Sequence, residues 1–238
     1  GLNELGKSIA EVELDTPYGT PSAPICVIAE TPVRILFLPR HGQPHRFPPH
    51  RVNYRANLWA LREAGAHQVL AVYAVGGLHE PYAPAVLAAP DQLIDYTWGR
   101  EHSFGFTAAD ELVHVEFAEP FEMNLRKDLV RAARTAQIDI ETGACVAVSQ
   151  GPRLETAAEI RRFRQDGCDL VGMTSMPEAS LAREAGLRYA SICVCANWAA
   201  GVRADPISMD AIRHTLGDAM IKVRSLLNAY FKEFANVE

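Results

Sequence analysis

Long apolar runs are missing from this 238-residue sequence: none reaches membrane-spanning length, and no secretory signal peptide is present. Cysteine is scarce, and its odd number argues against a disulfide framework. The cysteines lie in apolar stretches, which favours small buried residues over metal ligands: Cys26, Cys145, Cys168, Cys193 and Cys195. We therefore expect a cytoplasmic protein without a membrane partner.

An excess of positive charge is also missing, since the formal net charge is −6. Nucleic acid is therefore disfavoured as a partner, although a local basic pocket could still bind one nucleotide-sized anion. The sequence has no Ser-His-Asp nucleophile elbow, no zinc motif, and no dinucleotide or P-loop glycine spacing. Because it has no linker, low-complexity tract or internal repeat, we expect one domain over residues 1–238.

Short apolar, β-branched runs alternate with helical patterns along the chain. The expected strands are Ile25–Ala29, Arg34–Leu38, Gln68–Val75, Gln92–Tyr96, Ala144–Ser149, Leu170–Met173 and Tyr189–Ala196. The expected helices are Asn53–Ala64, Glu122–Ala136, Thr156–Asp166, Pro177–Ala185 and Pro206–Phe234. This alternation predicts a single-domain α/β fold, with a mixed or largely parallel β-sheet flanked by helices.

Ligands of such sheets bind beyond the carboxyl ends of the strands, so polar residues at those positions are candidates for a site. Arg40 and His41 directly follow the strand expected over 34–38, in a segment rich in Gly and Pro. The planar fork of an arginine suits a phosphate, and an adjacent histidine adds a donor. We favour an anion site here over a solvated basic loop, because the cluster begins where the strand ends.

Three further strand ends carry polar side chains, and each has a structural alternative. Glu155 is either a carboxylate aimed at a ligand N–H or a residue that favours a helix start. Thr174 and Ser175 lie beside a helix N-terminus, a natural anion site, unless Ser175 or Met176 merely caps that helix. Asn197 presents an amide to a heterocycle or serves a turn. Together these residues predict an anion cradle next to a clamp for a planar ligand.

The sequence resembles the purine-nucleoside phosphorylase and methylthioadenosine phosphorylase family from Tyr18-Gly19 to the C-terminal helix. Four blocks in order carry the resemblance: Arg40-His41-Gly42, Val52-Asn53-Tyr54-Arg55-Ala56-Asn57, Gly151-Pro152-Arg153-Leu154-Glu155-Thr156 and Gly172-Met173-Thr174-Ser175-Met176-Pro177-Glu178. The resemblance implies a homotrimer with sites near subunit interfaces. It also implies inorganic phosphate as co-substrate, with no metal or other cofactor.

Roles for individual residues follow from the same resemblance. The residues implied to hold phosphate are Arg40, His41, Thr174 and the backbone of Ala74. Met173 would pack under the sugar, and Leu154 stands where the family often places Phe against the base. His114 matches a histidine that a neighbouring subunit lends to the 5′ end of the sugar.

Two positions indicate which purine is bound. Family members that act on 6-aminopurines carry Asp at the positions of Asn197 and Ala199, whereas enzymes for 6-oxopurines pair Asn with a Glu at the position of Glu155. A 6-oxopurine offers N1–H to the carboxylate and accepts at N7 or O6 from the amide. Adenine lacks the N1 proton, and leaving the buried carboxylate unpaired costs about 1–3 kcal/mol. The sequence therefore predicts a 6-oxopurine substrate.

The second question about the substrate is which group the sugar carries at its 5′ position. Inosine-type enzymes place a His near the start of the last helix, where this sequence has Met209 and Ile212 on one helical face. An apolar face suits a methylthio group. The spacing alone is equally compatible with two core residues that hold the helix against the protein. Together with the purine choice, this pair predicts S-methyl-5′-thioinosine as the preferred substrate.

In the implied reaction, phosphate attacks C1′ while the glycosidic bond breaks through an oxocarbenium-like sugar. His41 and Asn197 would be the catalytic residues, orienting the nucleophile and stabilising charge on the departing purine. Gly1-Leu2 resembles the end of the family's Gly-Gly-Thr-Gly phosphate loop, so we expect the natural chain to begin with that loop and the strand before it. The alternatives are a general inosine and guanosine phosphorylase, a methylthioadenosine phosphorylase, a non-catalytic nucleoside-binding protein and a structural α/β protein.

Overall fold

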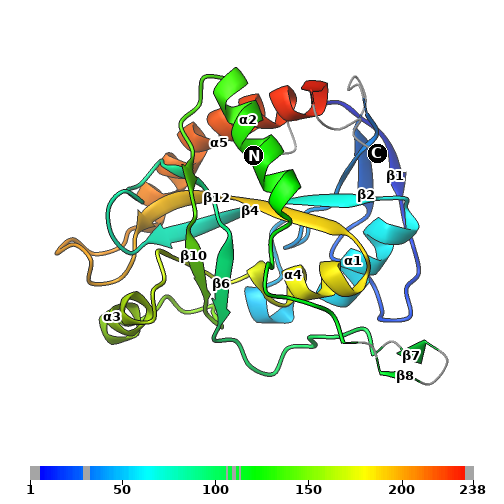
Figure 1. Cartoon of the computed structure of the whole chain (residues 1–238), viewed down its shortest axis with the longest axis horizontal. Coiled ribbons are helices and arrows are strands. Elements are labelled where there is room, and N and C mark those ends of the chain that lie inside the picture. The colour runs from blue at the N-terminus through cyan, green and yellow to red at the C-terminus, as the bar shows by residue number, and fades with distance from the viewer. Residues whose placement is uncertain (1–5, 29–32, 106, 109–110, 113, 234–238) are drawn as a thin grey trace.

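The computed structural model describes the chain except for residues 1–5, 29–32, 106, 109–110, 113 and 234–238. Its centre is a seven-stranded mixed sheet in the order β6-β10-β11-β4-β12-β5-β9 (Figure 1). The bounds are β4 Gln68–Gly77, β5 Leu87–Ala89, β6 Gln92–Asp95, β9 Glu141–Thr142, β10 Cys145–Val148, β11 Leu170–Gly172 and β12 Arg188–Trp198. The single-domain α/β fold with a mixed sheet is therefore confirmed.

Strands β4 and β12 form a long parallel pair at the middle of the sheet. In β12, residues 189–196 are all buried, which explains its unbroken apolar run. On the other side of β4, the strands β6, β10 and β11 run parallel to one another, with Asp95 beside Val148 and Val148 beside Gly172. Their carboxyl ends therefore meet at one edge, and the loops that leave them start side by side.

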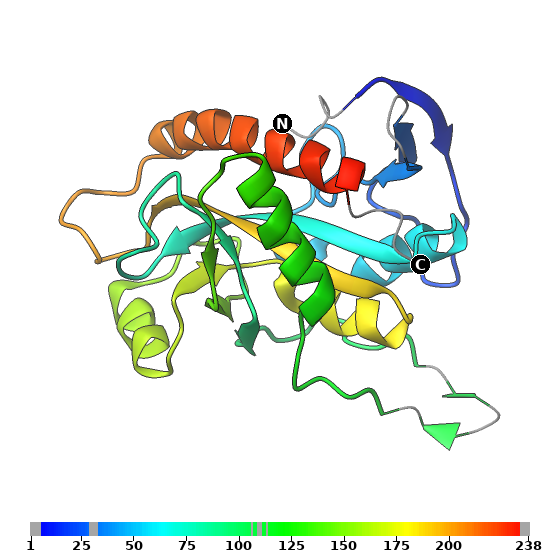
Figure 2. The same cartoon turned by 45° about the horizontal axis from the view of Figure 1, so that its top comes forward.

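Helices cover both faces of the sheet (Figure 2). Their bounds are α1 Tyr54–Glu63, α2 Met123–Thr135, α3 Ala157–Gln165, α4 Ser175–Glu184 and α5 Met209–Glu233. Helices α2 and α5 pack on one face through a cluster that includes Leu125, Leu226 and Ile192. Helices α1 and α4 pack on the other face, where Leu58, Leu181 and Tyr73 share a second cluster. All five helices expected from the sequence are confirmed, with ends shifted by a few residues.

A second, antiparallel sheet joins β1 (Ser8–Val12), β2 (Ile25–Ile28) and β3 (Ile35–Phe37). A short hairpin of β7 (Thr107–Ala108) and β8 (Glu111–Leu112) and a 3-10 turn over Pro49–Arg51 complete the described elements. The sequence did not predict β1, β5, β7, β8 or β9, which are short or polar. It ended β4 and β12 too early, since β4 runs through Gly77 and β12 through Trp198. Within the described part of the chain, no helix is both long and apolar enough to span a bilayer.

Candidate active site

The basic cluster after β3 is folded into a tight turn that directs Arg40 inward. The N–H of Gly42 donates to the Pro39 carbonyl over 2.8 Å, and Gly42 adopts φ +80°. Inside the protein, Arg40 forms a bidentate ion pair with Glu178 of α4, whose side chain is only 5% exposed. Arg40 is thus a largely buried, oriented cation and is not part of a solvated loop, although residues 43–46 that follow it are exposed.

Two tyrosines complete the surroundings of Glu178. The hydroxyls of Tyr73 on β4 and Tyr189 on β12 donate to its carboxylate over 3.2 and 2.9 Å. Burial would lower the pKa of Arg40, but the paired carboxylate outweighs burial and raises that pKa above its ordinary value. Arg40 therefore stays charged, and its net charge is compensated by Glu178. An anion bound here would be held mainly by directed N–H donors.

His41 lies beside Arg40 in a fixed orientation. Its Nδ1 lies 2.8 Å from the Phe47 carbonyl, and its ring stacks on His45 with centroids 4.3 Å apart. A carbonyl oxygen only accepts, so Nδ1 carries the proton and Nε2 is an acceptor in the neutral ring. Burial, followed by the charge of Arg40, lowers the pKa of His41. The neutral form is favoured, and it can accept a hydrogen bond from the hydroxyl of a phosphate.

Ala74 opens towards the same place, since it is exposed in a stretch of β4 whose neighbours Tyr73 and Val75 are buried. Arg40, His41, Ala74 and Glu178 line one cavity, which continues along β3, β4 and α5. Three of the four residues predicted to hold phosphate are thus brought together. Thr174, the fourth, does not line this cavity, but it immediately precedes α4 and its side chain does not cap that helix.

Gly77, the last residue of β4, is required by packing. A Cβ at Gly77 would collide with the carbonyl of Tyr82, so only glycine fits there. This contact accounts for Gly77 without any ligand.

Glu155 is not needed to start a helix. Thr156 caps α3 and forms a capping box with Glu159, so Glu155 is not the residue that caps this helix. The Glu155 carboxylate instead accepts a hydrogen bond from the Ser149 hydroxyl at the end of β10. It is half-buried and retains acceptor capacity for a ligand.

Asn197 lies within β12 at a bulge opposite Gly76, so the turn role for this residue is wrong. Its amide nitrogen donates to the Trp198 carbonyl over 2.6 Å. Among the described contacts, no hydrogen bond joins Asn197 to Glu155. The two halves of the predicted purine clamp come from separate strand ends, and their joint action stays a prediction.

The residues predicted around the sugar are less closely gathered. Met173 is half-buried, and its sulfur would lie 2.5 Å from a Cβ placed on Gly151, which also adopts φ +62°. Leu154 is 43% exposed and Met209 is 56% exposed, while Ile212 is half-buried and His114 is exposed. Neither Met209 nor Ile212 lines the cavity described above, so the apolar 5′ pocket remains a prediction.

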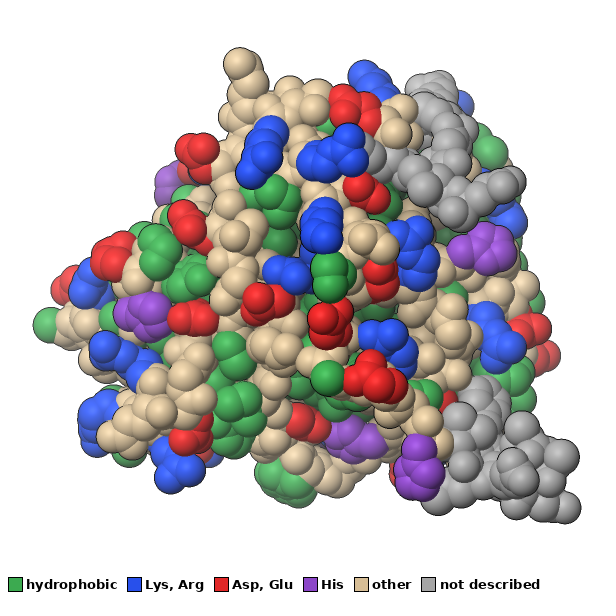
Figure 3. Space-filling view, viewed as in Figure 1, with side chains coloured by type: hydrophobic (Ala, Val, Ile, Leu, Met, Phe, Trp, Pro, Cys, Tyr) green, Lys and Arg blue, Asp and Glu red, His purple; other side chains and the backbone are tan. Residues whose placement is uncertain are grey.

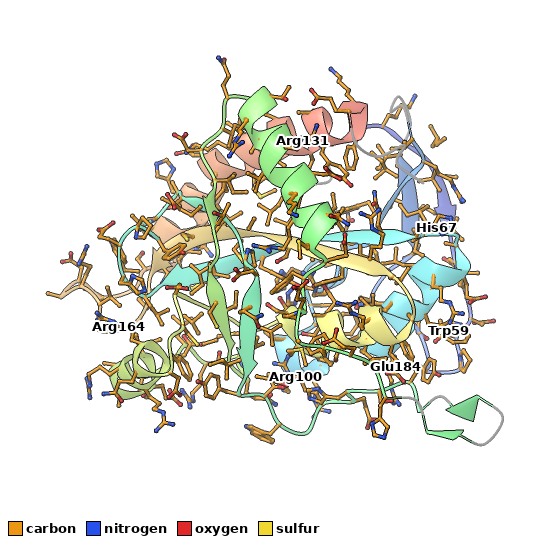
Figure 4. The ribbon with its side chains drawn as sticks, viewed as in Figure 1. Trp59, His67, Arg100, Arg131, Arg164 and Glu184 are labelled. Carbon is orange, nitrogen blue, oxygen red and sulfur yellow. The ribbon has the colours of Figure 1, made fainter. Side chains whose placement is uncertain are left out.

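Glu178 and Arg100 are site residues that the sequence did not single out. Glu178 ends one of the four blocks that carry the family resemblance, but no pattern in the sequence connects it with Arg40, 138 positions away. Arg100 follows β6 in a polar loop without a motif, and Figure 4 places it at the end of β6 near the start of α4. On the face in Figure 3, acidic and basic side chains are interspersed. Among the described residues, no group of three His, Cys, Asp or Glu is arranged for a metal ion.

Comparisons with known proteins agree on one family. A model described as the phosphorylase superfamily matches residues 2–232. A protein of Xanthomonas campestris named probable S-methyl-5′-thioinosine phosphorylase is 54% identical over 189 residues, which is 79% of this chain and 76% of that protein. A protein of Xylella fastidiosa with the same name is 48% identical over 90% of this chain and 88% of its own length. Methylthioadenosine phosphorylase from Schistosoma mansoni, solved with adenine, superposes with a TM-score of 0.93 at 32% identity, covering 99% of this chain and 88% of that one.

Proposed function

Because this chain belongs to the phosphorylase superfamily, we propose that it is a purine nucleoside phosphorylase whose preferred substrate is S-methyl-5′-thioinosine. The products are hypoxanthine and 5-methylthioribose 1-phosphate. The names of the relatives at 54% and 48% identity support this proposal. The observation that carries it is Glu155, a half-buried carboxylate that accepts a hydrogen bond from a serine hydroxyl and does not cap α3.

Phosphate binding rests on Arg40, His41, Thr174 and the backbone at Ala74. Arg40 uses three of its five N–H groups on Glu178 and on the Val72 carbonyl, so two remain for phosphate oxygens. His41 accepts from a phosphate hydroxyl through Nε2. These directed contacts hold one phosphate oxygen in line with C1′, which reduces the entropic part of the barrier.

The purine leaves with the electron pair of the C1′–N9 bond, while a phosphate oxygen forms the new bond to C1′. Negative charge grows on the base as the sugar becomes cationic. Asn197 donates to N7 or O6 and stabilises that charge, and Glu155 accepts from N1–H. Leu154 packs on the base and Met173 under the sugar.

The 5′-methylthio group is received by Met209 and Ile212, with His114 supplied by a neighbouring subunit of a homotrimer. The exposure of Met209, Leu154 and His114 in the single chain is consistent with a site that a second subunit completes.

The test is phosphorolysis of methylthioinosine, methylthioadenosine, inosine and adenosine, measured side by side with the natural full-length protein. Preference for methylthioinosine is expected. Equal or better use of inosine would reduce the proposal to a general 6-oxopurine phosphorylase, and preference for methylthioadenosine would overturn the assignment of the purine clamp.

A matched pair of variants tests the role of Glu155 in the purine clamp. Glu155→Gln replaces the charged acceptor for N1–H by a weaker, neutral amide oxygen and is expected to lower kcat/KM for methylthioinosine about tenfold or more, with a smaller loss for methylthioadenosine. Glu159→Ala, in the same segment, breaks the capping box instead. It should lower the melting temperature and leave the order of substrates unchanged. An unchanged substrate order in Glu155→Gln would contradict the clamp.

A further inference from the structure

Arg100 makes more polar contacts than the sequence gave reason to expect. It lies five residues after the end of β6, and its guanidinium extends over the carboxyl ends of β10 and β11 (Figure 4). Its NH1 donates to the carbonyls of Met173 and Met176 over 2.8 and 2.5 Å. Its NH2 donates to those of Ser149 and Gln150 over 3.4 and 2.8 Å, and its Nε donates to the Gln150 side chain over 3.2 Å.

These five contacts account for all five N–H donors of an arginine. No donor is left for a ligand, so Arg100 does not bind substrate itself. Among the described residues it forms no ion pair with a carboxylate, because every acceptor is a carbonyl of the backbone or of an amide side chain. Burial lowers the pKa of this guanidinium. A partly buried cation without a carboxylate partner is costly, and the five hydrogen bonds offset that cost.

The acceptors belong to two loops with different roles in the proposed reaction. The loop after β10 carries Ser149, which bonds Glu155 at the purine position. The loop after β11 carries Met173 and Thr174, at the sugar and phosphate positions. The two loops also touch at Gly151, where a Cβ would approach the Met173 sulfur to 2.5 Å. Arg100 hydrogen-bonds to both loops.

We propose that Arg100 is a positioning residue. It fixes the distance between the loop after β10, called here the purine-holding loop, and the loop after β11, which holds sugar and phosphate. The inference rests on the proposed function. The nucleophile and the leaving group stand on opposite sides of C1′ in the transition state. A shift of one loop against the other therefore misaligns them, even when each ligand still binds its own loop.

The loop that carries Arg100 is itself tied to the purine-holding loop. The Trp98 N–H donates to the Gln150 side-chain oxygen over 3.2 Å, and the Gln150 amide donates back to the Trp98 carbonyl over 2.9 Å. A lysine at position 100 keeps the charge but offers three donors from one point, so it cannot reach all five acceptors in both loops.

The first experiment compares Arg100→Lys with the unchanged protein in steady-state phosphorolysis. We expect kcat to fall about 10- to 100-fold, while KM for phosphate and KM for nucleoside each change less than about threefold. Arg183→Lys is the matched control, because Arg183 donates to the Glu119 carbonyl at the surface of α4. It should leave kcat unchanged. A kcat for Arg100→Lys equal to that of the control would overturn the inference.

A second measurement does not depend on turnover. Hydrogen exchange of peptides covering residues 149–156 and 173–178 should accelerate in both loops of Arg100→Lys, and in neither loop of Arg183→Lys. Millimolar guanidinium should restore part of the activity of Arg100→Ala, whereas sodium at the same concentration should not. Unchanged exchange, or no rescue in a folded Arg100→Ala, would count against a positioning role. If the protein without any substitution cleaves no nucleoside, the proposed function itself is refuted.

Discussion

At the scale of single residues, the site depends on charges that are compensated before any ligand arrives. The charge of Arg40 is compensated by Glu178, and burial favours the neutral form of His41. In the proposed site, phosphate is therefore expected to be selected by the direction of donors and acceptors more than by net positive charge. This arrangement suits a chain whose overall charge is −6.

The lowered pKa of His41 predicts how stability depends on pH. The unfolded histidine, with a pKa near 6.5, takes up a proton more readily than the folded one. The free energy of unfolding should therefore decrease as pH falls from about 7 through the folded pKa, and level off below it. His41→Gln removes this contribution.

Thermal unfolding of both proteins between pH 5 and 8 measures the effect as a difference, in which the other titrating groups cancel. The melting temperature of the unchanged protein should drop more steeply below about pH 6.5 than that of His41→Gln. Parallel curves would show that His41 is not buried as described.

At the scale of elements, Glu178 joins four parts of the fold. It stands on α4, pairs with Arg40 after β3, and accepts from tyrosines on β4 and β12. The orientation of Arg40 thus depends on α4 being packed against the central strands. The same helix follows Thr174, so one element positions two of the predicted phosphate ligands.

Glu178→Gln should therefore affect both stability and phosphate binding. Removing one partner of a buried ion pair is expected to lower the free energy of unfolding by about 3–5 kcal/mol. KM for phosphate should rise about tenfold, because Arg40 loses its fixed orientation. Denaturant unfolding and steady-state kinetics measure the two effects.

The milder Tyr189→Phe removes one hydrogen bond to the same carboxylate and should cost about 1 kcal/mol. It keeps the ion pair, so KM for phosphate should change little. If Glu178→Gln leaves that KM unaltered as well, Arg40 does not hold phosphate.

At the scale of the whole molecule, the described chain leaves its predicted sugar site open. Trp98 is 71% exposed beside the loop that follows β10, and Met209 is 56% exposed at the start of α5. Exposed apolar side chains near a site are typical of surfaces that another subunit covers. This supports the proposed homotrimer, in which His114 acts on a neighbouring site.

Light scattering of the natural full-length protein should give the mass of three chains. In that trimer, His114→Ala is expected to raise KM for methylthioinosine about tenfold without changing the mass or KM for phosphate. His214→Ala, an exposed histidine of α5 that faces Asp218, is the control and should change neither KM. A monomer with full activity would exclude a contribution from a second subunit.

The sequence by itself determined the α/β class, the main strands and helices, and the segments that follow the strands. It did so because apolar periodicity and glycine, proline and capping residues act locally. Only the tertiary structure decided which of these segments meet. Glu178 reaches Arg40 across 138 positions, and Arg100 links the loops after β10 and β11, because the parallel strands β6, β10 and β11 end at one edge. Contacts between distant residues follow from strand order and helix packing, and no local pattern encodes them.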